Sequence, residues 1–162
     1  MAITLDIQSA YDTVDHSALP WKLKAKGAPR YMVAWIKAFL SDRTADLMVN
    51  ELTFPFDIPT GIPQGSPLSP TLFLVFIDDL LHQLQRRVRV QAYADDILLW
   101  DVLTTRDRTP SQIQQALREV EIWSSEWGLS FNPSKCHAID ITNRRTMGEL
   151  HLHMYGTLLT QV

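Results

Sequence analysis

One segment of the sequence carries more structural information than any other: Arg89-Val90-Gln91-Ala92-Tyr93-Ala94-Asp95-Asp96-Ile97-Leu98-Leu99-Trp100. Its two apolar-rich runs, residues 89–93 and 97–100, have the composition of β-strands and flank Ala94, Asp95 and Asp96. We therefore expect a β-hairpin with both acids at its tip. Acids in such a turn often only stabilise the turn itself, so this segment indicates a function only in combination with other parts of the sequence.

The composition is that of a globular protein with a buried core. The chain has 162 residues, of which 46% are hydrophobic, enough for one domain. Its net charge of −3 argues against strong non-specific binding of nucleic acid by this piece alone, because phosphate neutralisation needs clustered Lys and Arg. The single cysteine, Cys136, permits neither an internal disulfide nor a Cys-based zinc site, which suits a reducing compartment.

Neither a membrane segment nor a secretory signal is expected. The longest apolar stretch, residues 72–77, is too short to span a bilayer. The first residues lack a basic region and reach an acid, Asp6, too early for a signal peptide. We expect an intracellular protein, nuclear or cytoplasmic, that is not secreted.

The start of the chain predicts a strand. Ile3, Leu5 and Ile7 alternate with Thr4 and Asp6, the pattern of a half-buried strand with Asp6 on the face away from the core. Other patterns predict helices over residues 16–26, 29–40, 71–84 and 109–127, extended segments over 45–53, 54–59 and 136–141, and a hairpin over 149–162. The apolar stripe of the second helix is expected to be Met32, Trp35, Ile36, Phe39 and Leu40.

This order of elements predicts an α+β fold, an antiparallel sheet with helices packed on one face. On the free face, Asp6 can meet Asp95 and Asp96. Three neighbouring carboxylates repel one another unless divalent cations neutralise them, and Mg²⁺ prefers oxygen ligands supplemented by water and substrate phosphates. We expect two Mg²⁺ ions at these acids, with Mn²⁺ as a possible substitute, acting on a phosphate-bearing substrate.

Four motifs in order resemble those of reverse transcriptases. Motifs A, B and C are matched by Leu5-Asp6-Ile7-Gln8-Ser9-Ala10-Tyr11-Asp12-Thr13-Val14-Asp15-His16, Gly61-Ile62-Pro63-Gln64-Gly65-Ser66-Pro67-Leu68-Ser69-Pro70 and Tyr93-Ala94-Asp95-Asp96. Motif D is matched by Trp127-Gly128-Leu129-Ser130-Phe131-Asn132-Pro133-Ser134-Lys135. The elements Asp-Thr-Val-Asp-His and Asn-Pro-Ser-Lys make the chain most similar to the non-LTR, LINE-type retrotransposon polymerases.

The resemblance implies a polymerase palm over residues 1–162 and RNA-templated addition of deoxynucleotides to a primer 3′-hydroxyl. RNA template, DNA primer and deoxynucleoside triphosphates would be its partners. Asp6 and Asp95 would ligate the two metal ions, assisted by Asp96, and Lys135 would be a candidate acid for the pyrophosphate. The alternative for Lys135 is a solvated surface charge.

On the substrate side the resemblance implies four residues: Ile7, Tyr11, Gln64 and Gly65. Tyr11 matches the steric gate that excludes a 2′-hydroxyl, and Gln64 and Gly65 match the turn next to the nascent base pair. Tyr11 could instead pack in the core, and the Gln64-Gly65 turn could be only a rigid helix start.

The chain also departs from the family pattern. It begins at motif A and ends before a primer grip and thumb, so we expect a partial palm, without the N-terminal part of the fingers, that is weak or inactive alone. Gln8 stands where a lysine is frequent. Two alternatives stay open: a non-catalytic remnant that binds RNA or a partner, and a polymerase of the group II intron or retron type. The sequence does not indicate an oligomeric state.

Overall fold

The computed structural model describes residues 1–101, 109–141 and 150–162. They form two compact units, residues 1–10 with 77–162 and residues 11–76, and each is described by itself. Among the described residues, no helix is long and apolar enough to cross a membrane.

The first unit is built on a sheet with β1 (Ala2–Gln8) at its centre. The strands run in the order β10 (Thr160–Gln161), β7 (His137–Ile139), β1, β5 (Asp96–Trp100) and β4 (Arg89–Tyr93), and β6 (Ser130–Phe131) pairs with the end of β1. All pairs are antiparallel except β10 with β7. The sheet is therefore antiparallel, as expected, except at this edge, where β10 and β7 run parallel.

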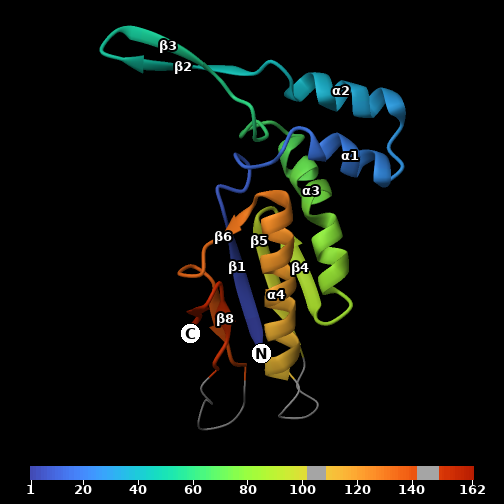
Figure 1. Cartoon of the computed structure of the whole chain (residues 1–162), viewed down its shortest axis with the longest axis vertical. Helices are drawn as coiled ribbons and strands as arrows, with labels where there is room; N and C mark the ends of the chain where they lie inside the picture. The colour runs from blue at the N-terminus through green and yellow to red at the C-terminus, as the bar shows by residue number, and fades with distance from the viewer. Residues whose placement is uncertain (102–108, 142–149) are drawn as a thin grey trace. The chain divides into compact units, whose positions relative to one another are not determined.

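One face of this sheet carries the helices. Helix α4 (Thr109–Trp127) lies across β1, β5 and β4, as Figure 1 shows. Apolar side chains from the strands and from α4 are buried together, namely Ile3, Leu5, Ile7, Ile97, Leu99, Ile113, Leu117 and Val120. The last turns of α3 (Ser69–Leu84) add Ile77, Leu80 and Leu84 to the buried set. The expected α+β arrangement, with helices on one face, is confirmed.

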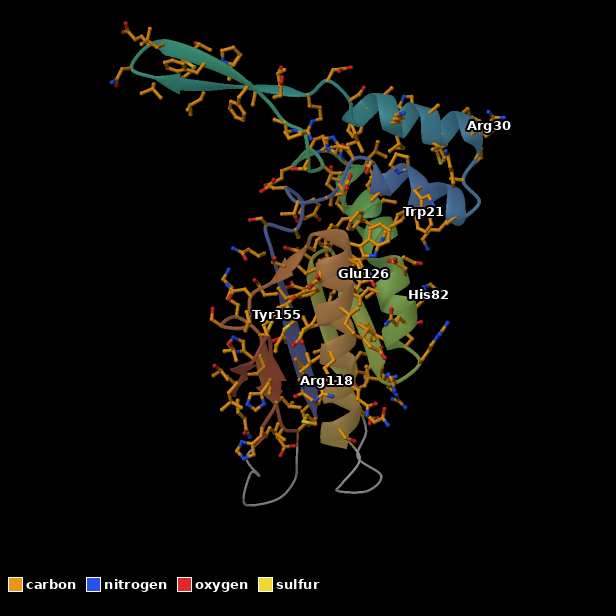
Figure 2. All side chains as sticks on the ribbon, viewed as in Figure 1. Trp21, Arg30, His82, Arg118, Glu126 and Tyr155 are labelled. Carbon is orange, nitrogen blue, oxygen red and sulfur yellow. The ribbon has the colours of Figure 1, made fainter. Side chains whose placement is uncertain are left out.

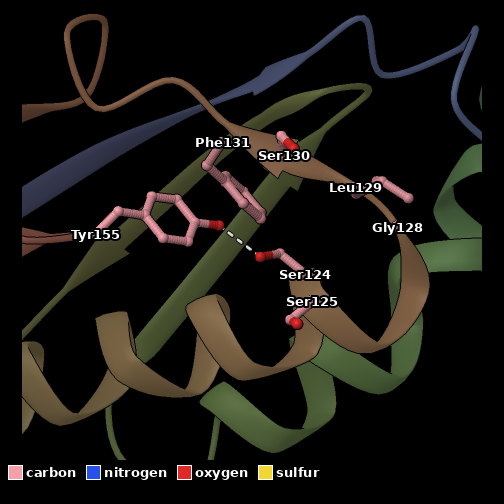
Figure 3. Close-up of a pocket in the computed structure, with 7 residues that line it drawn as sticks. All are labelled: Ser124, Ser125, Gly128, Leu129, Ser130, Phe131 and Tyr155. Atoms are coloured by element: carbon pink, nitrogen blue, oxygen red, sulfur yellow. Dashed lines mark hydrogen bonds between the residues drawn. The ribbon is translucent and has the colours of Figure 1, made fainter.

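A short hairpin near the C-terminus docks on α4. Strands β8 (His153–Met154) and β9 (Thr157–Leu158) are joined by Tyr155 and Gly156, both at positive φ. The Gln114 amide donates to the His153 carbonyl and accepts from the His153 N–H, both at 2.8 Å. The Tyr155 and Ser124 hydroxyls, 2.5 Å apart, border a cavity of about 410 Å³ (Figure 3). The hairpin predicted over residues 149–162 is confirmed for residues 153–158, and residue 149 lies outside the described residues. Side chain-to-backbone hydrogen bonds attach the hairpin to α4.

The second unit contains two helices and a two-stranded hairpin. Helix α1 (Ala18–Ala25) packs beside α2 (Arg30–Leu40). Strands β2 (Thr44–Val49) and β3 (Leu52–Asp57) are joined by Asn50 and Glu51, whose φ angles of 48° and 68° suit a two-residue hairpin turn. The sequence predicted both extended segments without predicting that they pair.

Two apolar surfaces of this unit face outward. The buried side chains of α2 are Val33, Ile36 and Leu40. The expected stripe is therefore correct at Ile36 and Leu40 and wrong at Trp35, which is 54% exposed. Trp35 stacks on Phe39 with ring centroids 5.5 Å apart. On the β2–β3 hairpin, the register puts apolar side chains on one exposed face, namely Leu47, Val49, Leu52, Phe54 and Phe56.

The start of α1 depends on Asp15. Its Oδ1 accepts hydrogen bonds from the Ser17 N–H at 2.6 Å and the Ser17 hydroxyl at 2.7 Å. The hydroxyl bond is the largest of the effects that hold the pKa of Asp15 below its ordinary value of 3.8, against the opposing effect of partial burial. An acid that accepts these donors stabilises the helix start.

Replacing Asp15 by alanine should lower the free energy of unfolding by about 1 kcal/mol at neutral pH. Because the folded-state pKa is depressed, the ionic part of this contribution is present above pH 3.8 and is lost as the pH falls through the folded-state value. Urea unfolding of wild type and Asp15→Ala, at neutral pH and at about pH 3, measures the difference, which should shrink in acid. An undiminished difference in acid would contradict the ionic contribution.

Candidate active site

The pairing of β1 with β5 places two carboxylates opposite each other. Asp6 is the register partner of Asp96, and their neighbours Leu5 and Ile97 are paired on the core side. Residues directly opposite in an antiparallel pair have Cα atoms roughly 4.5–5.5 Å apart. The Asp6 side chain is 36% exposed and Asp96 is exposed. The free face of the sheet therefore presents an acidic pair to solvent.

Asp95 stands beside this pair rather than within it. It is the second residue of the two-residue turn between β4 and β5, and Ala94, the first, has a φ of 53°. In the parts of the chain that the structure describes, no three His, Cys, Asp or Glu side chains are grouped closely enough to hold a metal ion. The strand register thus pairs two of the three predicted carboxylates, whereas Asp95 lies in the turn, outside the paired strands.

The loop after β6 is attached to the backbone of Asp6. The Asn132 N–H donates to the Asp6 carbonyl at 3.0 Å, and the Lys135 N–H donates to the Asn132 carbonyl at 3.0 Å. The Asn132 side-chain oxygen accepts from the Ser134 N–H and hydroxyl at 3.2 and 2.7 Å. This turn carries the Lys135 side chain to the acidic pair, where Nζ lies 3.8 Å from Asp6 Oδ2.

A buried thiol lies next to Asp6. The Asp6 N–H donates to Cys136 Sγ at 3.4 Å, and burial raises the pKa of the Cys136 thiol. A buried thiol with a raised pKa stays protonated at neutral pH and acts as a structural side chain. From the sequence, Cys136 indicated only a reducing compartment, and neither Cys136 nor Asn132 was predicted to support the site. Their positions on either side of Lys135 were the available signal.

Ile7 follows Asp6 on the opposite side of β1. Its side chain is 5% exposed and belongs to the core, and Ile7 pairs with Phe131 of β6. The side chain faces the helix layer because neighbouring residues of a strand point to opposite faces. Any contact between Ile7 and a substrate on the free face would have to come from its backbone.

The other three substrate-side residues belong to the second unit. The Tyr11 ring stacks on Phe73 with centroids 5.3 Å apart, and the Tyr11 carbonyl accepts from the Ile62 N–H at 2.7 Å. The Gln64 amide donates to Asp12 Oδ1 at 3.0 Å. Gly65 is exposed with a φ of +86°. The segment that follows β1 and the loop that precedes α3 are therefore joined directly.

Gly61 lies at the centre of this junction and was not among the predicted site residues. Its N–H donates to the Val14 carbonyl at 2.8 Å, and its carbonyl accepts from Arg43 Nη1 at 2.9 Å and His16 Nε2 at 2.6 Å. Its φ is +86°, and a Cβ atom there would lie 2.8 Å from the Asp12 carbonyl oxygen. Only glycine fits this position without displacing backbone.

The fold is that of a polymerase palm. It is similar to the solved structure of apo telomerase from Candida tropicalis truncated from its C-terminal domain, with a TM-score of 0.60 and 15% identity. The similarity covers 83% of this chain and 29% of that one. At this level of identity the likeness concerns the fold alone.

Sequence comparison shows the family. Residues 1–149 match the model described as reverse transcriptase (RNA-dependent DNA polymerase), and the chain belongs to this family. It is 34% identical over 149 residues to the RNA-directed DNA polymerase from mobile element jockey of Drosophila funebris, covering 86% of this chain and 16% of that protein. It is 30% identical over 149 residues to the Pol polyprotein of the R2 element of Popillia japonica, covering 85% and 24%.

These relatives come from non-LTR retrotransposons, so the type indicated by the sequence motifs is confirmed. A third relative, the probable RNA-directed DNA polymerase from transposon BS of Drosophila melanogaster, is 34% identical over 83% of this chain and 16% of its own length. The chain thus spans 16–24% of the length of these three relatives.

Replacing Asp96 by asparagine should stabilise the metal-free protein. Like charges directly opposite in a sheet are destabilising, so the free energy of unfolding should rise by about 0.5 kcal/mol in EDTA. Urea unfolding measures this, with Asp101→Asn as the matched control, since Asp101 follows the other end of β5. Unchanged or lower stability of Asp96→Asn would contradict close approach of the two carboxylates.

Gly61 and Gly65 allow a second comparison, because both have a φ of +86°. An added Cβ atom would clash with neighbouring atoms at Gly61, whereas at Gly65 it would meet no atom within 4 Å. Gly65→Ala should lower the free energy of unfolding by about 1 kcal/mol through backbone strain alone. Gly61→Ala should cost about 3 kcal/mol, since overpacking against Asp12 adds to the same strain. Parallel urea titrations measure both, and equal losses would show that the contact with Asp12 is easily relieved.

Proposed function

We propose that this chain forms the palm of an RNA-directed DNA polymerase of the non-LTR type, which extends a primer 3′-hydroxyl with deoxynucleotides on an RNA template. The observation that carries the proposal is the Asp6–Asp96 pair on the free face of the sheet, in a chain of the reverse transcriptase family. The names of its relatives, RNA-directed DNA polymerases, support this activity. Such a reaction implies a nuclear or cytoplasmic location.

Divalent metal ions serve reverse transcriptases in general, and the donors present fit Mg²⁺. Asp6 and Asp95, assisted by Asp96, would hold two Mg²⁺ ions, with Mn²⁺ as a substitute, because exposed carboxylates offer the hard oxygen ligands that Mg²⁺ prefers. Two carboxylates in register make a sparse site, so substrate phosphates would complete the coordination. When bound, the ions would lower the pKa of the primer 3′-hydroxyl and stabilise the charge on departing pyrophosphate.

The residues of the chain itself supply positioning and a proton. Lys135 carries an ammonium group that the Asn132 turn holds at the acidic pair, where it can protonate the pyrophosphate leaving group. Tyr11 would act as the steric gate, since stacking on Phe73 fixes its ring and a rigid ring excludes a 2′-hydroxyl by shape. Gln64 and Gly65 would approach the nascent base pair from the loop before α3.

Primer extension on poly(A)/oligo(dT), with Mg²⁺ or Mn²⁺, tests the proposal. Asp6→Asn and Asp95→Asn should each lower the rate at least about a hundredfold, because the metal ions contribute several kcal/mol of transition-state stabilisation. Asp101→Asn serves as the control, since it removes the same charge at the other end of β5. Extension that persists in Asp95→Asn would refute the assignment of the metal ligands.

A binding measurement makes the test independent of turnover. Calorimetry with a deoxynucleoside triphosphate in the presence of Mn²⁺ should show binding by the wild-type chain and loss of binding in Asp6→Asn. Binding that is equal in the two would overturn the site. Absence of binding in the wild-type chain would favour the alternative of a non-catalytic remnant.

A further inference from the structure

The acidic pair already has a cation in contact with it. Lys135 Nζ lies 3.8 Å from Asp6 Oδ2, on the same free face to which the register assigns Asp96. The Lys135 side chain is 65% exposed and that of Asp6 36% exposed, so solvent reaches both partners. The ammonium therefore offsets part of the repulsion between two facing carboxylates without being buried with them.

The position of this ammonium follows from its backbone. Asn132 accepts the Lys135 N–H through its carbonyl, and its own N–H donates to the Asp6 carbonyl, both at 3.0 Å. The two Ser134 donors that bind the Asn132 side-chain oxygen hold the turn closed. The backbone of Lys135 is thus attached to Asp6, the residue whose carboxylate the Lys135 ammonium contacts, and the ammonium itself is exposed to solvent.

We propose that Lys135 is a built-in counter-ion of Asp6, which a divalent cation must displace in order to bind, and that the displaced ammonium then pairs with the triphosphate of the nucleotide. This inference rests on the proposed function. An exposed ion pair is worth little, about 0–1 kcal/mol, so the contact gives way readily to a divalent ion. The same ammonium loses a carboxylate and gains a phosphate when cation and triphosphate arrive together.

One consequence is that binding of the divalent cation and binding of the triphosphate should be coupled. A cation that binds alone must break the Lys135–Asp6 contact without compensation, whereas the triphosphate provides a new anionic partner for the ammonium. Each ligand should therefore raise the affinity for the other, and the factor must be the same in both directions. Part of this coupling should depend on Lys135.

Titration of the 162-residue chain with Mn²⁺ alone, monitored by electron paramagnetic resonance, tests the role of Lys135 as a counter-ion. Lys135→Met should bind Mn²⁺ about threefold to fivefold more tightly than wild type, the factor that corresponds to an exposed ion pair. The gain should shrink at high ionic strength, because salt screens the contact that is lost. Arg118→Met is the matched control: it removes one positive charge from the exposed side of α4, on the helix layer (Figure 2), and should leave the affinity unchanged.

A second variant keeps the Lys135 charge and removes the side-chain hydrogen bonds that close the turn before Lys135. Asn132→Ala deletes the side-chain oxygen that binds Ser134, so the turn should loosen and Lys135 should contact Asp6 less often. Its Mn²⁺ affinity should shift in the same direction as that of Lys135→Met, by a smaller factor. Amide resonances of β1 in the nuclear magnetic resonance spectrum verify that each variant remains folded and show where Mn²⁺ broadens signals.

The variant Asp6→Asn distinguishes the hypothesis of a metal site at Asp6 from the hypothesis that Lys135 is its counter-ion. Loss of Mn²⁺ binding in Asp6→Asn together with tighter binding in Lys135→Met would support both the site and the counter-ion. Loss in Asp6→Asn with unchanged or weaker binding in Lys135→Met would overturn the counter-ion and leave the site intact. Wild-type binding that survives Asp6→Asn, or no binding by the wild-type chain, would overturn the site and with it the inference.

Discussion

The pairing of β1 with β5 is the constraint on which the rest of the first unit depends. One register places Ile3 and Leu5 opposite Leu99 and Ile97 on the core side and Asp6 opposite Asp96 on the other. Because side chains alternate along a strand, a slip of one residue would expose the apolar set and bury the acids. Core packing and the acidic pair are therefore two results of a single alignment.

A comparison of two free energies, that of apolar burial and that of charge repulsion, explains why the protein tolerates facing carboxylates. Ile3, Leu5, Ile97 and Leu99 are each at most 2% exposed, and full burial of such a side chain contributes about 1.5–3 kcal/mol. Repulsion between like charges in a cross-strand pair costs at most about 1 kcal/mol. The core thus outweighs the repulsion several times over, and the Lys135 ammonium reduces it further.

The second unit shows where local patterns mislead. In α2 the expected stripe includes Ile36 and Leu40, which are buried, but the helix also buries Val33 and leaves Trp35 half exposed. Periodicity identifies a helix, but the side it buries depends on what packs against it. The β2–β3 hairpin was equally hard to predict, because its turn uses Asn50 and Glu51 rather than a common Asn-Gly pair.

By itself, the sequence determined the strand around Asp6, the hairpin that carries Asp95 and Asp96, the long helices and the four family motifs, because each depends on local periodicity, turn residues or a contiguous signature. Only the tertiary structure decided that Asp96 rather than Asp95 faces Asp6, that Asn132 brings Lys135 to the same carboxylate, and that Gly61 joins the segment after β1 to the loop before α3. These features are contacts between distant parts of the chain, made largely through backbone atoms common to all residues, and such contacts leave no periodic trace in the sequence.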